Sequence, residues 1–384
     1  MKLLEFLERF LFETAPWRLV SVIAVLIFVK VGVWYMPNLG DSNVLARNPF
    51  VNPFANPDAH YLMWNWFGPF LAWATGLTGR LEFFLLHLAF SIAFFFLVLY
   101  ALFKRFEPTQ ARTAFLLFIV LPVSATAFFW VGTDSITLFI FTVVLVFPRP
   151  AIIPLLAGLL LGMEHFEQAF LAFAALLFSL VLTRMTQRTD PGSTAFTNGR
   201  RPVPDIGTCL FVLFGDLLGK ALLSGLFHYW HVEMNSGRLQ WLKEHFTAVL
   251  SGFALHFEVV IWSVLGLGWI AALRYLDLAR KPLPFFASLL GLCLTLPFFA
   301  DQTRVLAIVS FPLIATYWLL NEELLARVSR REVAGLFLAW VVMPWSWVWS
   351  GLPKWSAFPF DVAFLIHAVS GAIDVPRNLD AWPF

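Results

Sequence analysis

The sequence predicts an all-α protein with about eleven membrane-spanning helices. Of its 384 residues, 60% are hydrophobic and only 13% are charged, whereas a soluble domain typically carries about 25% charged residues. Apolar runs recur along the chain, and a helical bilayer span takes roughly 20 such residues. Lysine and arginine gather in alternate loops between these runs. Together these observations predict a single integral membrane domain over residues 1–384, with ten to twelve spans.

The N-terminal segment, MKLLEFLERFLFETAPWR, mixes apolar and charged residues and has no small-residue cleavage site before the first long apolar run. We expect an amphipathic helix on the cytoplasmic surface of the membrane, not a removable signal peptide. The spans expected after it are 17–36, 82–103, 112–131, 135–147, 151–165, 167–183, 205–228, 251–273, 283–300, 305–320 and 333–350.

The distribution of basic residues orients this threading. With the N-terminus inside, the cytoplasmic loops carry 17 lysines and arginines and the outer loops carry 7, while Lys30 and Lys220 lie within spans. This bias follows the positive-inside rule. We expect an integral protein of a bacterial inner membrane, with a cytoplasmic N-terminus and an active site on the periplasmic side.

The long first outer loop, about 37–81, contains three Asn-Pro steps in NPFVNPFANP. Proline disfavours the helical state of the residue before it, so an extended, stiff ribbon is expected there. The aromatic-rich segment 58–78 and a second outer segment, 236–250, are expected to form helices at the membrane interface. The cytoplasmic loop 184–204 is expected to be flexible, and 357–372 is either a re-entrant or interfacial segment or a twelfth span.

Side chains suited to chemistry concentrate in the outer loops. Asp58 follows the Asn-Pro steps, where a carboxylate in fixed geometry suits a general base, and a helix N-cap is the alternative. Asp41 is the second candidate, with a turn aspartate as its alternative. Asp134 lies at the outer membrane surface between two spans, either as a helix cap or as a site residue.

Two further outer junctions carry ionisable groups at membrane depth, where such groups are functional candidates by default. Glu164, His165 and Glu167 lie between two short spans, and a water-exposed tight turn is the alternative interpretation. Arg304 follows Asp301 at the start of a span. It is expected either to pair with Asp301 or to bind a phosphate through its forked donors.

Other ionisable and thiol groups have a structural interpretation. Asp216 lies one turn from Lys220 within a span and is its expected partner. Cys209 and Cys293 both lie in apolar runs, so no disulfide is expected between them. The sequence has no GxxxxGK[ST], HExxH, GxSxG or Asp-x-Asp motif. We expect no obligatory metal, no cofactor and no nucleic-acid partner.

The layout resembles the membrane glycosyltransferases of the GT-C superfamily, mainly over residues 17–183. Asp58-Ala59-His60-Tyr61 resembles an aspartate-to-tyrosine motif early in several of these families. Pro122 through Ser135 resembles the proline-containing span and polar turn that follow, and Gly158 to Gln168 resembles a small-residue span with a polar outer junction. The chain departs from the best-known members because it has neither an appended soluble domain nor an Asp-x-Asp motif.

The resemblance implies transfer of a sugar from a polyprenyl-phosphate-linked donor to a glycan or lipid acceptor, among membrane lipids on the periplasmic or luminal face. Asp58, or Asp41 in its place, would deprotonate the acceptor hydroxyl, and Arg304 would match an arginine that contacts the donor phosphate. Substrate contacts are expected from His60, Tyr61, Asp134, Glu164, His165, Asp301, Arg304, Arg238 and Lys243. The alternatives are a polymerase or ligase of lipid-linked glycans, a transporter or flippase, and a non-catalytic assembly subunit.

Overall fold

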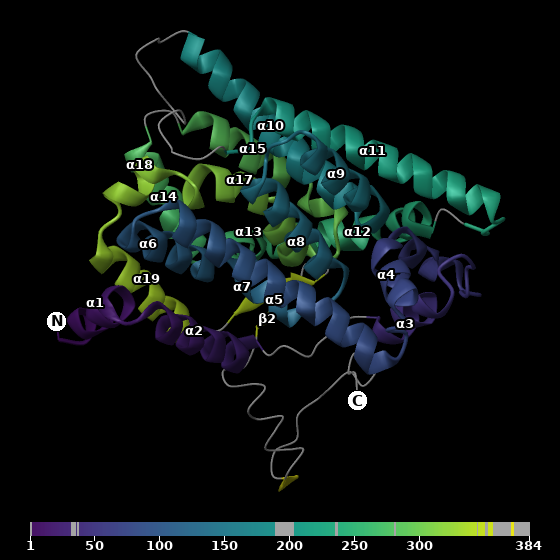
Figure 1. Cartoon of the computed structure of the whole chain (residues 1–384), viewed down its shortest axis with the longest axis horizontal. Coiled ribbons are helices and arrows are strands. Elements are labelled where there is room, and N and C mark those ends of the chain that lie inside the picture. Colours follow the sequence, from purple (N-terminus) through teal and green to yellow (C-terminus); the bar gives the residue numbers. More distant parts are fainter. Residues whose placement is uncertain are drawn as a thin grey trace.

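The computed structural model is an all-α protein, in which the described strands are one short antiparallel pair (Figure 1). It describes residues 2–31, 36, 38–188, 203–234, 237–279, 282–343, 345–349, 352–355 and 370–371. The all-α prediction is therefore confirmed. The segment 357–372 lies almost entirely outside the described residues, as does most of the loop 184–204.

The first half of the chain contains α1 (Lys2–Glu13), α2 (Pro16–Val31), α3 (Leu39–Arg47), the 3-10 helix η1 (Pro57–Trp64), α4 (Phe67–Thr75), α5 (Arg80–Arg105), α6 (Pro108–Val120), α7 (Pro122–Phe129), α8 (Thr133–Val146), α9 (Ile152–Glu164) and α10 (Phe166–Arg188). The second half contains α11 (Ile206–Tyr229), α12 (Gly237–Leu255), α13 (Phe257–Leu265), α14 (Gly268–Leu278), α15 (Leu283–Cys293), η2 (Leu296–Phe298), α16 (Gln302–Val309), α17 (Phe311–Ile314), the π-helix η3 (Ala315–Leu319), α18 (Glu322–Arg327), α19 (Arg330–Val342), β1 (Ser346–Trp349) and β2 (Leu352–Trp355).

Three described helices are long and apolar enough to cross a membrane alone: Arg80–Arg105, Phe166–Thr186 and Ile206–Tyr229. Three more candidates arise if each bent helix pair is one span. These pairs are α1 with α2, bent by 118°, α6 with α7, bent by 61°, and the described part of α12 with α13, bent by 84°. By length and composition, the described part of the chain therefore has three to six candidate spans.

Two of the expected spans are interrupted helices. The span at 112–131 breaks at Leu121, where Pro122 begins α7 and cannot continue the backbone hydrogen bonding of α6. The span at 251–273 is divided among α12, α13 and α14. The expected span at 333–350 is helical only to Val342, because the chain then forms β1.

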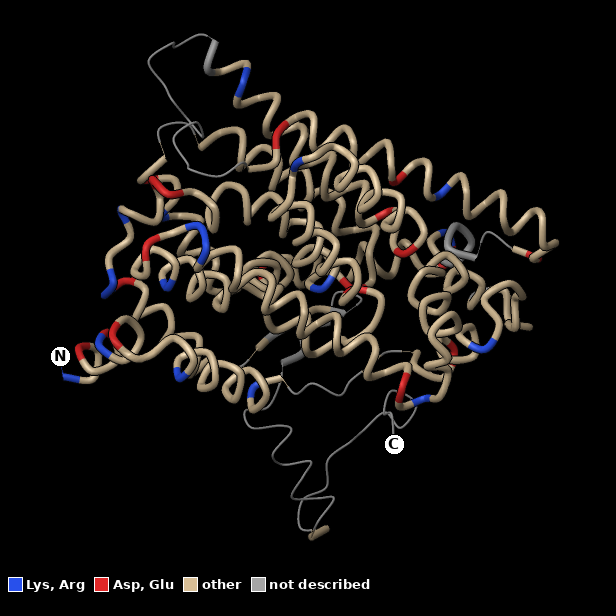
Figure 2. The backbone as a smooth tube through the Cα atoms, viewed as in Figure 1, with Lys and Arg blue, Asp and Glu red and all other residues tan. Residues whose placement is uncertain are grey.

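The two ends of the molecule differ in composition. Figure 1 shows α1 and α18 at the end that carries the N-terminus, and α3 and α4 at the opposite end. Figure 2 shows a cluster of lysines and arginines at the N-terminal end, around α1, α18 and α19. The first-loop helices thus lie far from the main basic cluster.

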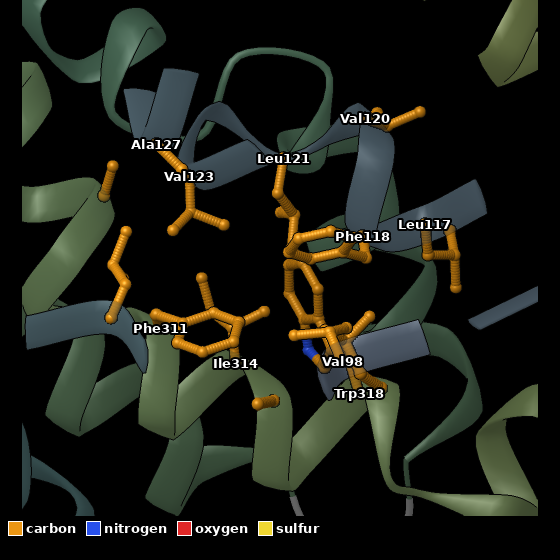
Figure 3. Close-up of a cluster of buried hydrophobic side chains, with 14 of the residues drawn as sticks. Val98, Leu117, Phe118, Val120, Leu121, Val123, Ala127, Phe311, Ile314 and Trp318 are labelled. Carbon is orange, nitrogen blue, oxygen red and sulfur yellow. The ribbon is translucent and has the colours of Figure 1, made fainter. Parts of the chain in front are cut away.

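A large aromatic core joins the helices between these ends. Phe94 of α5 contacts Phe118 of α6 and Phe311 of α17, with ring centroids 5.7 and 5.5 Å apart in edge-to-face geometry. Figure 3 shows Phe118, Phe311 and Trp318 within this cluster. Edge-to-face packing of this kind adds stabilisation beyond the burial of apolar area.

The segment around the Asn-Pro steps turns at Asn48 and Asn52, where an extended ribbon was expected. The side-chain oxygens of Asn48 and Asn52 accept hydrogen bonds from the backbone amides of Phe50 and Phe54, at 3.1 and 3.0 Å. Each is the local Asn turn that competes with regular structure. Phe50 consequently packs against Trp230 beyond the end of α11, with the ring centroids 4.3 Å apart.

The closest helix contact is between α9 and α11, where glycines face backbone. A Cβ atom on Gly162 would lie 2.1 Å from the Asp216 carbonyl oxygen, and one on Gly219 would lie 2.1 Å from the Leu159 carbonyl oxygen. Small residues allow such close approach of membrane helices. This contact therefore requires glycine.

Replacing Gly219 by alanine is expected to lower the free energy of unfolding by about 1–3 kcal/mol, the usual cost of overpacking. The measurement is an SDS-unfolding titration in mixed micelles. Gly225→Ala is the matched control on the same helix, because nothing lies within 4 Å of its Cβ position. Equal unfolding midpoints for the two variants would contradict this interpretation.

Candidate functional site

Three acidic and basic residues form an ion network where α8 and α16 begin. Arg304 Nη1 donates to Asp134 Oδ2 at 2.7 Å, and Arg304 Nε donates to Asp301 Oδ2. The Asp134 side chain is 2% exposed and that of Arg304 is 25% exposed. The network is therefore mostly shielded from solvent but open at the guanidinium.

Each member of this network lies at the N-terminus of a helix. Asp134 lies in the first turn of α8, where Gly132 is the N-cap, so Asp134 is not the cap. Asp301 occupies the N-cap position of α16 but makes no side-chain capping bond. Both carboxylates contact Arg304 instead, so the alternative capping interpretation of Asp134 was wrong.

A histidine at the junction of α9 and α10 lies beside Asp134 of this network. His165 is the residue after α9, and its Nδ1 lies 3.7 Å from Asp134 Oδ1. Its side chain is 9% exposed. The expected alternative, a water-exposed turn at Glu164 and His165, is excluded because both residues are buried.

Glu164 lies beside this network and is completely buried. Its Oε2 accepts a hydrogen bond from the backbone amide of Gly68 in α4 at 2.7 Å. Asp134 acts on it electrostatically. A Cβ on Gly68 would meet His87 Nε2 at 2.8 Å, so this glycine lets α4 approach both side chains.

The network has two carboxylates, those of Asp134 and Asp301, but only one guanidinium, that of Arg304. Burial raises the pKa of Asp301, Arg304 lowers it and Asp134 adds a smaller rise, so that this pKa is about 6. A proton on Asp301 would relieve the repulsion between the two aspartates. Asp301 therefore takes up a proton at a higher pH than an ordinary aspartate does.

Aromatic rings cover the guanidinium. The centroid of the Trp130 ring lies 5.8 Å from Arg304 Cζ, within the range of a cation–π contact. Trp345 and Trp347 pack against Trp130, with centroid distances of 5.7 and 5.9 Å. The sequence does not indicate this aromatic wall, because residues 333–350 are as apolar as a membrane span.

The hairpin that carries these tryptophans is fixed to α16. β1 and β2 are antiparallel, with Ser346 opposite Trp355 and Trp349 opposite Leu352. The Val348 backbone amide donates to Thr303 Oγ1 at 2.9 Å, and Thr303 also shares a 2.5 Å hydrogen bond with Ser263. The signal in the sequence was Pro344, because a proline cannot continue the backbone hydrogen bonding of a helix.

The first-loop candidates lie outside this network or beyond what the structure describes. Asp58 belongs to η1, but its side chain lies outside the described part. Asp41 is exposed on α3. His60 Nε2 lies 3.0 Å from the Phe54 carbonyl oxygen, and Tyr61 Oη accepts from Asn38 Nδ2 at 3.1 Å.

The two basic candidates of the expected second outer segment lie on α12. Lys243 is exposed. The side chain of Arg238 lies outside the described residues. Neither contributes to the described contacts of Arg304.

Lys30 and Lys220, which the sequence places within spans, have structural surroundings. Lys30 Nζ donates to the carbonyl oxygens of Trp340 and Met343 at the end of α19, where a cation complements the helix dipole. Lys220 Nζ lies 3.5 Å from the centroid of the Trp64 ring. The expected pairing of Lys220 with Asp216 involves no hydrogen bond, because neither Asp216 carboxylate oxygen has a hydrogen-bond partner.

Within the described residues, no group of three His, Cys, Asp or Glu side chains is placed to hold a metal ion. The network is thus built from ion pairs, an imidazole and aromatic rings. Chemically it suits an anion that approaches the exposed part of Arg304. No protein-family model, curated protein sequence or solved structure matches the chain.

Removing one carboxylate from the network is expected to be costly. Asp134→Ala leaves Arg304 with one fewer partner in a mostly buried site, and such losses reach about 3–5 kcal/mol of unfolding free energy. Arg149→Ala breaks an ion pair with Asp205 whose side chains are 73% and 49% exposed, so its expected cost is about 0–1 kcal/mol. SDS titration of both variants measures the difference. Similar losses for the two would show that the Arg304 network is not a stabilising element.

Proposed function

We propose that the chain is a membrane glycosyltransferase that uses a polyprenyl-phosphate-linked sugar donor on the outer face of the membrane. The observation that carries this proposal is the partly exposed Arg304 guanidinium, held by Asp134 and Asp301 and covered by Trp130. A guanidinium held in place before the reaction stabilises negative charge as it develops on a leaving phosphate.

Arg304 retains donors for a phosphate within this arrangement. Its Nε and Nη1 take part in the ion pairs with Asp301 and Asp134, whereas the two N–H groups of Nη2 take part in neither. A phosphate oxygen accepts such a bond strongly because both groups are charged. In this proposal the aromatic wall shields the phosphate from water, and His165 lies on the opposite side of Asp134.

The proposal includes the eleven-span threading, a cytoplasmic N-terminus and a periplasmic site in a bacterial inner membrane. The catalytic base is Asp58 on η1, with Asp41 as its substitute. The first outer loop contacts the site region, because the Trp66 amide donates to the Met163 carbonyl oxygen at 3.0 Å and Gly68 binds Glu164. These contacts would place η1 near the acceptor.

One observation favours transport as a second function. A pocket is lined by residues at two helix breaks: Leu121 and Pro122 between α6 and α7, and Gly266 and Leu267 between α13 and α14. Discontinuous helices often border transporter sites. Uptake of labelled lipid-linked sugar by proteoliposomes, without covalent change, would favour this function.

The base assignment is tested with Asp58→Asn and Asp41→Asn, assayed for sugar transfer from a polyprenyl-phosphate donor. We expect Asp58→Asn to lose about 10²–10⁴-fold in rate, the usual contribution of a general base. Asp277→Asn, an exposed aspartate paired with Arg274, is the control and should retain the rate. Full activity in both first-loop variants would refute the assignment.

Donor binding is expected to strengthen severalfold as pH falls from about 7 to about 5. The pKa of Asp301 is raised to about 6, so this carboxylate is ionised above that pH and takes up a proton below it. Protonation removes a negative charge beside Arg304 and favours a phosphate there. A donor phosphodiester keeps its single charge over this range. Titration calorimetry with wild type and Asp301→Asn checks the trend, and an unchanged pH dependence in the variant would contradict it.

A further inference from the structure

A second acidic residue lies deep within the helices, apart from the Arg304 network. Asp216 is on α11, ten residues after its first residue, and is completely buried. Neither of its carboxylate oxygens has a hydrogen-bond partner among the described residues. A carboxylate without partners in apolar surroundings is among the least stable groups a protein can contain.

The surroundings of Asp216 contain few charges. α9 meets this turn of α11 through Gly158 and Gly162, whose Cβ positions lie within 3.0 Å of Asp216 backbone atoms. The charged side chains that act on Asp216 are Glu167 from the first turn of α10 and Lys220 from α11. One is acidic and the other basic, so together they supply no net positive charge.

Lys220 is held away from a hydrogen bond with Asp216. Its ammonium lies 3.5 Å from the centroid of the Trp64 ring and 5.4 Å from that of Phe166. Contacts with ring faces stabilise a desolvated ammonium. Asp216 therefore lacks the hydrogen-bonded cation that would keep its carboxylate ionised.

We propose that Asp216 is a proton-binding site within the helix bundle, whose carboxyl group holds a proton at rest and exchanges it with Glu167. In the exchange, the O–H bond at Asp216 breaks and an O–H bond forms at the Glu167 carboxylate. Asp216 is left as an anion, and the flexible Lys220 side chain one turn away then compensates its charge. The site is independent of glycosyl transfer, and its ligand is a proton.

Exchange with Glu167 gives the proton a route to solvent. Glu167 is half-buried at the junction of α9 and α10, whereas Asp216 is completely buried. A proton that leaves Asp216 thus moves toward the end of the bundle that carries His165.

Infrared spectroscopy of the purified full chain tests the resting state. We expect a protonated carboxyl band at neutral pH that shifts on transfer to D₂O and is lost in Asp216→Asn. Asp277→Asn, with an exposed carboxylate, should leave the band unchanged. A spectrum of Asp216→Asn identical to that of wild type would overturn the proposal.

Stability provides a second, independent test. A protonated Asp216 is mimicked by asparagine, so Asp216→Asn is expected to unfold at or above the wild-type SDS concentration, and its effect should add to that of Lys220→Met. An ionised pair predicts the opposite: a large loss in Asp216→Asn that Lys220→Met rescues. A variant that does not fold without the aspartate charge would also count against the proposal.

The route is tested by the rate of the D₂O shift. Glu167→Gln is expected to slow exchange at Asp216 by about tenfold or more, because a proton-transfer group has been removed. Glu258→Gln on α13 is the control. An unchanged rate in Glu167→Gln would exclude Glu167 from the route. Loss of sugar transfer in the first-loop variants bears on the proposed function alone, since these spectra need no turnover.

Discussion

The shared pairing of Arg304 with Asp134 and Asp301 is the constraint on which the site depends. A guanidinium is not deprotonated in proteins, so burying most of it requires carboxylates at fixed positions. Asp134 is supplied by the first turn of α8, and Asp301 and Arg304 by the start of α16. The starts of two helices, far apart in the sequence, are thereby held together.

Interrupted helices allow the Arg304 network to form in an apolar chain. A continuous span uses its backbone polar groups internally and presents mainly side chains. At a break, backbone groups and short polar side chains become available, as at Thr303, which accepts the Val348 amide. Because β1 is bonded to the start of α16, Trp345 and Trp347 lie against Trp130. The aromatic wall thus follows from the way in which α19 ends.

The sequence predicted the fold class and much of the network, for identifiable reasons. Polar residues are rare in these apolar runs, so Asp134, His165 and Arg304 were recognisable without a structure, and the chain brings them together. Their partners were less predictable. Periodicity alone did not distinguish a helix cap from an ion pair at Asp134, because both place an aspartate in the first turn.

Other features depended on geometry that composition does not encode. The i,i+4 spacing of Asp216 and Lys220 favoured a pair, but an aromatic ring, Trp64, from a distant segment competes for the ammonium. The residues at 333–350 are as apolar as a span, yet Trp347 lies in β1 and packs with Trp345 against Trp130. In both cases aromatic side chains changed the outcome, because their contacts are made across the fold.

The two buried acidic sites differ in what balances their charge. In the Arg304 network, a permanent cation pairs with Asp134 and leaves Asp301 adjustable near pH 6. At Asp216 the adjacent cation is engaged by aromatic rings, so a proton is the remaining means of neutralising the carboxylate. A permanent cation suits the binding of an external anion, whereas a proton can enter and leave. The Arg304 network, with its available cation, therefore suits anion binding. Asp216, which is deeper and has no hydrogen-bonded cation, suits proton binding.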